Sequence, residues 1–87
     1  MTPAATRPRA IRGANLWAIR EDDLRMTRAQ LAESLGISPA FLWKIENDKA
    51  QPSPAVRGQI VDRLAEITDT SREAVIARLI AAEQVAA

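Results

Sequence analysis

The sequence of 87 residues contains no cysteine and no histidine. Their absence excludes disulfide bridges, zinc sites built from Cys and His, thiol nucleophiles and histidine-based catalytic triads. Carboxylates remain for acid–base chemistry, but the acidic run at 21–23 is better explained as the solvated end of a helix. We therefore expect a protein that is not an enzyme and that holds no metal, cofactor or small-molecule ligand.

Long hydrophobic runs are also missing, since the longest fall far below the roughly 20 residues that a membrane span requires. No apolar segment follows the arginines near the amino end, as it would in a secretory signal. The sequence therefore predicts a soluble, cytoplasmic protein without a membrane partner, which the lack of cysteine also favours. A chain of this length forms one small domain, and its hydrophobic content of 47% excludes a wholly disordered chain.

The charges are nearly balanced, since 12 Lys and Arg residues against 11 Asp and Glu residues leave a net charge of +1. This average hides an uneven distribution. Nine basic and six acidic residues give 1–57 a charge of +3, whereas three basic and five acidic residues give 58–87 a charge of −2. The arginines that precede the first helix make residues 1–13 a candidate flexible basic arm that can meet phosphate, although a solvated tail has the same composition.

The rest of the sequence predicts helices. It is rich in Ala, Leu, Ile, Arg and Glu, has only three glycines, and shows no alternating pattern of a strand. The expected helices span about 14–24, 28–35, 39–46, 54–66 and 71–84. The acidic run at 21–23 opposes the dipole of the first helix, so we expect that helix to fray early or to need a tertiary partner.

Local signals mark where these helices begin and end. Thr27 and Gln30 have the spacing of a capping box, and Gly36 can adopt the positive φ of a helix carboxyl cap. Ser-Pro pairs at 38–39 and 53–54 each place an N-cap serine before a proline in the first helical position. A second capping box is expected at 70–73.

A helix, a tight turn with glycine and a second helix are the signature of a helix-turn-helix. Ala32 is small where the two helices cross, Gly36 makes the turn, and Ile37 ties the second helix to the core. With this pattern the segment 27–54, TRAQLAESLGISPAFLWKIENDKAQPSP, resembles the Cro/cI-type (XRE-like) helix-turn-helix family of phage and bacterial repressors. The resemblance covers about residues 14–67.

The sequence departs from the family pattern at two places. The loop before the second helix, Asp23 to Met26, lacks the usual glycine and is one residue longer. Asp48 stands where the family usually has glycine, and aspartate tolerates left-handed geometry better than most residues. Both departures concern the geometry of loops rather than the fold.

The resemblance implies an all-α fold, a compact five-helix bundle of the lambda-repressor-like type, preceded by the flexible arm. It implies a DNA-binding domain at 14–67 and makes the helix at 39–46 the recognition helix, which lies in the major groove. The remaining segment, 68–87, is then a carboxyl-terminal helix and the candidate dimerisation element, because its apolar residues cover more than one side.

Helical geometry independently selects the residues of 39–46 that can face DNA. Leu42 and Ile45 point inward, which leaves positions 40, 43, 44 and 47 on the opposite face. Lys44 can donate to guanine or to a phosphate, while small apolar side chains can pack on a thymine methyl group. Trp43 either packs on base methyls and sugars or folds back onto the protein. The predicted base-reading residues are Pro39, Ala40, Trp43 and Lys44.

The resemblance also assigns residues around the recognition helix. The predicted phosphate contacts are Arg28, Ser38, Asn47 and Lys49. Glu46 matches a glutamate that typically pairs with an arginine of the first helix, for which Arg20 is the candidate, and such a pair would be structural. The arginines of the arm, Arg7, Arg9 and Arg12, precede the first helix as do arms that enter the minor groove in related architectures. Trp17 is expected to be a packing residue of the core or its rim.

The leading hypothesis is a transcriptional regulator that binds double-stranded DNA as a homodimer on a two-fold operator, as phage or prophage repressors and Cro-like proteins do. Two alternatives stay open. The chain can be the antitoxin of a toxin–antitoxin pair, in which the helix-turn-helix domain of the antitoxin also binds the toxin. It can also be a domain that kept the fold and lost DNA recognition, an alternative raised by the nonpolar side chains at 39, 40 and 43.

Overall fold

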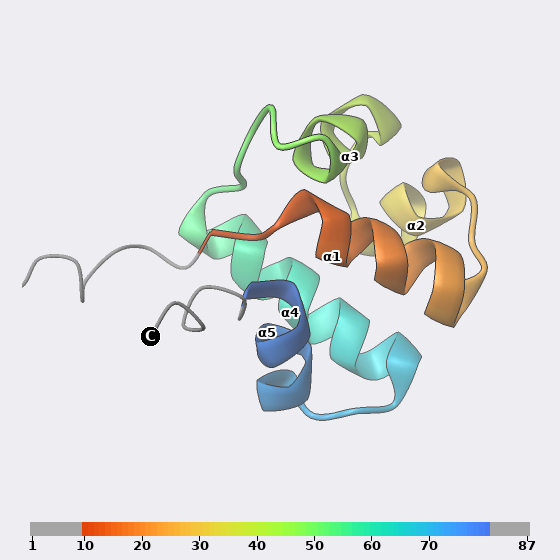
Figure 1. Ribbon diagram of the computed structural model, residues 1–87, viewed down its shortest axis with the longest axis vertical. Helices are drawn as coiled ribbons and strands as arrows, with labels where there is room; N and C mark the ends of the chain where they lie inside the picture. Colours follow the sequence, from red (N-terminus) through yellow and green to blue (C-terminus); the bar gives the residue numbers. More distant parts are fainter. Residues whose placement is uncertain (1–9, 81–87) are drawn as a thin grey trace, which may run out of the picture.

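The computed structural model describes residues 10–80, and Figure 1 shows them as a packed set of helices. The elements are α1 (Gly13–Ala18), η2 (Ile19–Leu24), α2 (Arg28–Leu35), α3 (Pro39–Glu46), α4 (Pro54–Thr68) and α5 (Arg72–Ile80). Since η2 continues α1 without a break, these form five helices, and no strand occurs in residues 10–80. The expected all-α fold with a helix-turn-helix, α2 to α3, is confirmed.

The helix starts from α2 to α4 follow the local signals of the sequence. The backbone N–H of Gln30 donates to Thr27 Oγ1 at 3.1 Å and that of Thr27 donates to Gln30 Oε1 at 2.8 Å, so the capping box forms. Ser38 and Ser53 each accept a hydrogen bond from the backbone of the third residue after them. Gly36 ends α2 with a φ of 77°, which turns the chain toward α3.

The start of α5 differs from the prediction. Ser71 is the capping residue, because its Oγ accepts a hydrogen bond from the backbone N–H of Ala74 at 3.0 Å. The hydroxyl of Thr70 instead lies 2.8 Å from that of Thr68. The predicted capping box at 70–73 is therefore wrong by one residue. α5 is described to Ile80, and the rest of the predicted helix, 81–84, lies outside the described residues.

The first helix also differs, because its second half is π-helical rather than α-helical. The backbone N–H groups of Arg25 and Met26 both donate to the carbonyl of Arg20. A π-helical turn holds one residue more than an α-helical turn. It therefore takes up the extra residue that the sequence shows before α2, and Arg25 ends it in the left-handed region at φ 54° and ψ 43°.

The core lies where all five helices meet, and α1 separates α3 from α5 (Figure 1). The side chains that build it are buried to 3% exposure or less. They are Ile11, Leu16, Ile19, Leu31, Ala32, Leu35, Leu42, Ile45, Ile60, Val61, Leu64, Val75 and Leu79.

The folded part begins earlier than the expected boundary at residue 14. Ile11 is only 1% exposed, and the backbone N–H of Arg12 donates to the carbonyl of Leu79 in α5 at 3.0 Å. Gly13 lies so close to α3 that an added Cβ would come within 2.3 Å of the carbonyl oxygen of Glu46. Residues 11–13 are therefore packed against the helices and are not part of a flexible arm.

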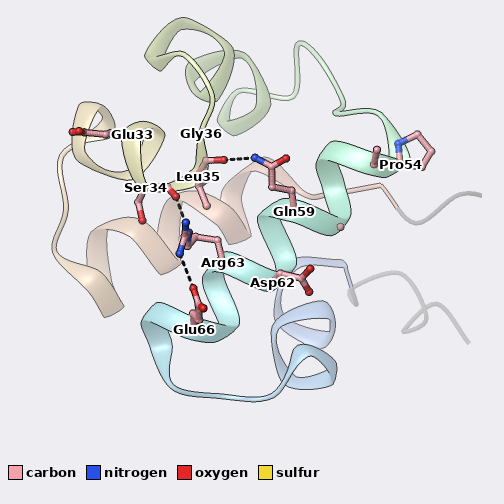
Figure 2. Close-up of a pocket in the computed structure, with 11 residues that line it drawn as sticks. Glu33, Ser34, Leu35, Gly36, Pro54, Gln59, Asp62, Arg63 and Glu66 are labelled. Atoms are coloured by element: carbon pink, nitrogen blue, oxygen red, sulfur yellow. Dashed lines mark hydrogen bonds and ion pairs between the residues drawn. The ribbon is translucent and has the colours of Figure 1, made fainter.

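A groove runs between the carboxyl end of α2 and α4 (Figure 2). The last carbonyls of a helix have no partner within it. Here Gln59 Nε2 donates to the carbonyl of Leu35 at 2.8 Å, and Arg63 Nε donates to that of Ser34 at 2.9 Å (Figure 2). The polar side chains of α4 in this groove thus supply hydrogen bonds to the last carbonyl groups of α2. Across residues 10–80 the structure has no helix with the length and apolar character needed to cross a membrane.

Candidate nucleic-acid interface

The outward face of α3 carries all four residues predicted to read bases. Leu42 and Ile45 are fully buried on the inner face of the helix, as expected. Trp43 is 43% exposed and does not fold into the core. The four outward residues, Pro39, Ala40, Trp43 and Lys44, are all exposed. This face therefore offers small apolar groups, one large aromatic ring and one cation to a partner.

The only acidic residue of α3, Glu46, is turned away from this face. Its side chain is 1% exposed and accepts hydrogen bonds from Arg20, from Nε to Oε2 at 2.7 Å and from Nη2 to Oε1 at 3.1 Å. The pair expected from the sequence is thus formed. The hydrogen bond with Glu46 raises the pKa of Arg20 above its ordinary value, because it stabilises the charged guanidinium.

Arg28 is a second partner of the same carboxylate. Its Nε lies 3.2 Å from Glu46 Oε1, while its side chain stays 35% exposed at the first residue of α2. The Glu46 cluster, which we define as Arg20, Arg28 and Glu46, joins η2, α2 and α3. Arg20 also pairs with Glu21, from Nη1 to Oε2 at 3.3 Å, so two carboxylates face the two guanidinium groups. The guanidinium of Arg28 is partly exposed and can therefore also meet an anion from solvent.

The other predicted phosphate contacts lie at the two ends of α3. Ser38 caps the start of α3, and its Oγ accepts a hydrogen bond from the backbone N–H of Phe41, which leaves the hydroxyl proton free to be donated. Asn47 follows the end of α3 and its Nδ2 donates to the carbonyl of Trp43 at 2.9 Å. Lys49 is exposed in the loop that leads to α4.

The cations of the helices away from α3 are mostly paired with acids. Arg63 pairs with Glu66 within α4, while ion pairs join α5 to α4 and to η2, namely Arg72 with Asp62 and Arg78 with Asp23. By contrast, no ion pair within residues 10–80 includes Lys44 or Lys49. Lys44 and Lys49 thus place positive charge without an ion pair in residues 10–80 on α3 and on the loop after it, and the same holds for Arg25 at the end of η2 and Arg57 in α4.

The structure places the predicted arm residues differently from one another. Arg7 and Arg9 lie outside the described residues. Arg12 belongs to the packed segment by its backbone, and its side chain is exposed. Trp17, expected as a packing residue of the core or rim, is 45% exposed on α1 and is not part of the core.

Three contacts around α3 were not predicted from the sequence. Gln51 and Asp48, in the loop after α3, bind the backbone of Ile11 and Gly13, and Arg28 binds Glu46. Asp48 has a φ of 58°, so the left-handed geometry considered for it does occur. No local sequence pattern predicts these hydrogen bonds, because the partners are 18 to 40 residues apart in the sequence.

A family model described as a helix-turn-helix domain matches residues 6–79. Comparisons with curated proteins and with solved structures gave no match. The matched range is wider than the predicted 14–67 and includes α5 up to Leu79 as well as the packed segment before α1. Domains of this kind bind DNA with the second helix of the motif, which is α3 in this chain. Because the match covers most of the sequence and the motif is present in the fold, the chain belongs to the helix-turn-helix domain family.

Proposed function

We propose that this protein is a sequence-specific transcriptional regulator of the Cro/cI type, which binds double-stranded DNA through α3. The observation that carries the proposal is the charge of the outward face of α3. The only acid of this helix is buried between two arginines, while Lys44 and Lys49 take part in no ion pair within residues 10–80. Phosphates attract such a surface and no carboxylate on the helix repels them.

In this proposal α3 lies in the major groove. Lys44 donates to the O6 and N7 of guanine, and Ala40 and the edge of Pro39 pack on thymine methyl groups. Trp43 covers base methyls or sugars, which removes its exposed ring from water. Because the α3 face carries a single cation and two small side chains, it can read only a few base pairs.

Contacts to the DNA backbone accompany these base contacts and fix the register of the protein on the duplex. Arg28 and Ser38 bind phosphates on one side of α3, and Asn47 with Lys49 on the other. The arginines before the first helix, Arg7, Arg9 and Arg12, are the proposed contacts to the adjacent minor groove, with Arg12 contributing from the packed segment. Among these, Arg28 is the contact best supported by geometry, because Glu46 orients its guanidinium while leaving it 35% exposed.

One such domain reads too few bases for useful specificity, so we further propose a homodimer on a two-fold operator with half-sites about one helical turn apart. The carboxyl-terminal segment with α5 is the proposed dimer surface. α5 lies on the opposite side of α1 from α3 (Figure 1), so a dimer formed through α5 leaves α3 accessible. Small repressors and Cro-like proteins of phages are organised in this way.

Selection of bound sequences from a random DNA library tests this function directly. We expect enrichment of one sequence with two-fold symmetry, and a loss of affinity in Lys44→Ala of about 1–3 kcal/mol if this residue contacts a base. Arg63→Ala is the matched control, because this cation lies on α4 and pairs with Glu66. No enrichment at low salt, or equal losses in both variants, contradicts the proposed function.

A further inference from the structure

The loop after α3, residues 47–53, is bonded through its backbone to the last turn of that helix. The N–H of Lys49 donates to the carbonyl of Lys44 at 2.7 Å, and the N–H of Asp48 donates to that of Ile45 at 3.1 Å. The last carbonyls of a helix have no partner within it, so these bonds satisfy groups that the helix leaves open. They fix the backbone of Lys49 relative to the end of α3.

Side chains on both sides of Lys49 bind a second part of the chain, the packed segment before α1. Asp48 Oδ1 accepts a hydrogen bond from the N–H of Gly13 at 2.9 Å. Gln51 Oε1 accepts one from the N–H of Ile11 at 2.9 Å, and Gln51 Nε2 donates back to the carbonyl of Ile11 at 2.9 Å. A side-chain amide can make both bonds at once only in one orientation. The loop is therefore held from a second direction as well.

The segment that holds the loop is itself fixed. Ile11 is only 1% exposed, and the N–H of Arg12 donates to the carbonyl of Leu79 in α5 at 3.0 Å. Gly13 leaves no room for a side chain, because an added Cβ would lie 2.3 Å from the carbonyl oxygen of Glu46. This segment is thus a rigid support for the loop beside it.

The side chain of Lys49 remains open to a partner although its backbone is held. It is exposed, and no ion pair within residues 10–80 includes it. The adjacent acid, Asp48, is turned to the N–H of Gly13 instead. Ordering a loop on binding costs free energy, and a loop that is already ordered avoids this cost. The arrangement therefore presents one cation from a preorganised backbone.

We propose that Gln51 and Asp48 are positioning residues for Lys49. By binding the backbone at residues 11 and 13, they hold the loop in the conformation in which Lys49 contacts a phosphate of duplex DNA. The inference rests on the proposed DNA-binding function and goes beyond it, because it assigns a role in binding to two side chains that act through Lys49 and not on the DNA.

The first test is a double-mutant cycle between Gln51 and Lys49. Affinity for a mixed-sequence duplex of about 20 base pairs is measured by fluorescence anisotropy at several salt concentrations. Each phosphate contact contributes about −0.9 to the slope of log affinity against log salt, so Lys49→Ala is expected to make the slope shallower by about 0.9. Gln51→Ala is expected to lose most of the same amount, and to lose nothing further in Lys49→Ala/Gln51→Ala.

A pair of variants at position 48 tests the other bond without a difference in charge. Asp48→Asn keeps an acceptor for the N–H of Gly13, whereas Asp48→Gly removes it, and both remove the carboxylate. Asparagine and glycine both tolerate the φ of 58° at this position. Asp48→Asn is expected to keep the contribution of Lys49 to the salt slope, and Asp48→Gly is expected to lose part of it.

A matched control separates positioning from a general loss of stability. Gln59→Ala removes a comparable bond from a side-chain amide to a backbone carbonyl, that of Leu35 on α2, and is expected to keep the full salt slope. Thermal unfolding of each variant, followed by circular dichroism, sets a temperature at which all are folded.

Three results overturn the inference while DNA binding itself stands. One is an unchanged slope in Lys49→Ala. Another is a loss in Gln51→Ala that is equally large with and without Lys49, since that marks a general structural effect. The third is an equal slope in Asp48→Asn and Asp48→Gly, which removes Asp48 from the proposed role. If the unaltered chain does not bind the duplex even at about 50 mM salt, the proposed DNA-binding function fails and this inference fails with it.

Discussion

Glu46 shows how a single buried residue shapes the surface of a helix. A buried carboxylate is costly unless it is paired and hydrogen-bonded, and here arginines from η2 and α2 meet it. Because the pKa of Arg20 is raised, the contribution of the pair to stability is fully present below the ordinary pKa of arginine. It is lost only as the pH rises through the higher value. Arg20 therefore keeps its charge at neutral pH and well above it.

Glu46→Gln is expected to lower the free energy of unfolding by about 3 kcal/mol, because it leaves Arg28 without its counter-charge and buried Arg20 with only the partly exposed Glu21. Urea denaturation followed by circular dichroism measures the change. Glu66→Gln is the control, because Glu66 pairs with Arg63 where both side chains are about half exposed or more. Such a pair contributes about 0–1 kcal/mol. Equal losses in the two variants would show that the Glu46 cluster has no special structural role.

Arg25 has a backbone conformation that is unfavourable for any residue with a Cβ atom. Its φ of 54° lies in the left-handed region, which costs a residue with a Cβ roughly 1–2 kcal/mol and costs glycine almost nothing. Arg25→Gly is therefore expected to raise the free energy of unfolding by about 1 kcal/mol, after the greater freedom of glycine in the unfolded chain is subtracted.

The same substitution within a regular helix is expected to change the free energy of unfolding in the opposite direction. Arg57 lies in α4, and Arg57→Gly is expected to lower the free energy of unfolding by about 1 kcal/mol, since glycine is a poor helix former. Chemical denaturation of both variants checks the pair. A loss of stability in Arg25→Gly would contradict the assignment of left-handed strain at the end of η2.

At the scale of helices, the sequence predicts those helix boundaries that are set by hydrogen bonds between residues close together in the chain. The start of α2 is set by Thr27 and Gln30, three residues apart, and the starts of α3 and α4 by the serines at 38 and 53. α3 has the expected bounds for this reason. The π-helical turn η2 was not predicted, because it depends on where the Glu46 cluster and the start of α2 hold the chain on either side of one extra residue.

The exposed aromatic ring on α3 gives a prediction for that element alone. Trp43→Ala is expected to weaken binding to the selected operator by at least about tenfold, which corresponds to about 1.4 kcal/mol. The free energy of unfolding should hardly change, because 43% of the residue is already exposed to water. Anisotropy titrations and thermal melts measure the two quantities.

The chain offers a matched control for this variant in α1. Trp17 is exposed to nearly the same extent, 45%, but lies outside the helix-turn-helix. Trp17→Ala is expected to change operator affinity by less than about twofold. If the two substitutions weaken binding equally, the loss reflects a general effect of removing surface tryptophan, and α3 loses its special role in recognition.

At the scale of the whole molecule, the contacts that could not be predicted from the sequence are hydrogen bonds between residues far apart in the chain. The residues on the outer face of α3 could be named from helical spacing, because spacing is a local property. The bonds from Gln51, Asp48 and Arg28 join residues far apart in the sequence, and they depend on how the helices pack. These bonds bring residues 11–13 into the folded domain, which is why the sequence assigned them to the arm.

The two sides of the molecule also lead to a prediction about assembly. In α5, Val75 and Leu79 are buried, while Ala74 and Ala77 are exposed. These exposed small residues lie on α5, which α1 separates from α3, and they suit close packing of a second copy, so we expect the chain to sediment as a dimer. Ala77→Glu puts a charge on that surface and is expected to give a monomer with an unchanged helical spectrum and weaker operator binding. Ala55→Glu, an exposed site in α4, should remain dimeric. An unaltered chain that sediments as a monomer while it binds the operator contradicts the assignment of α5.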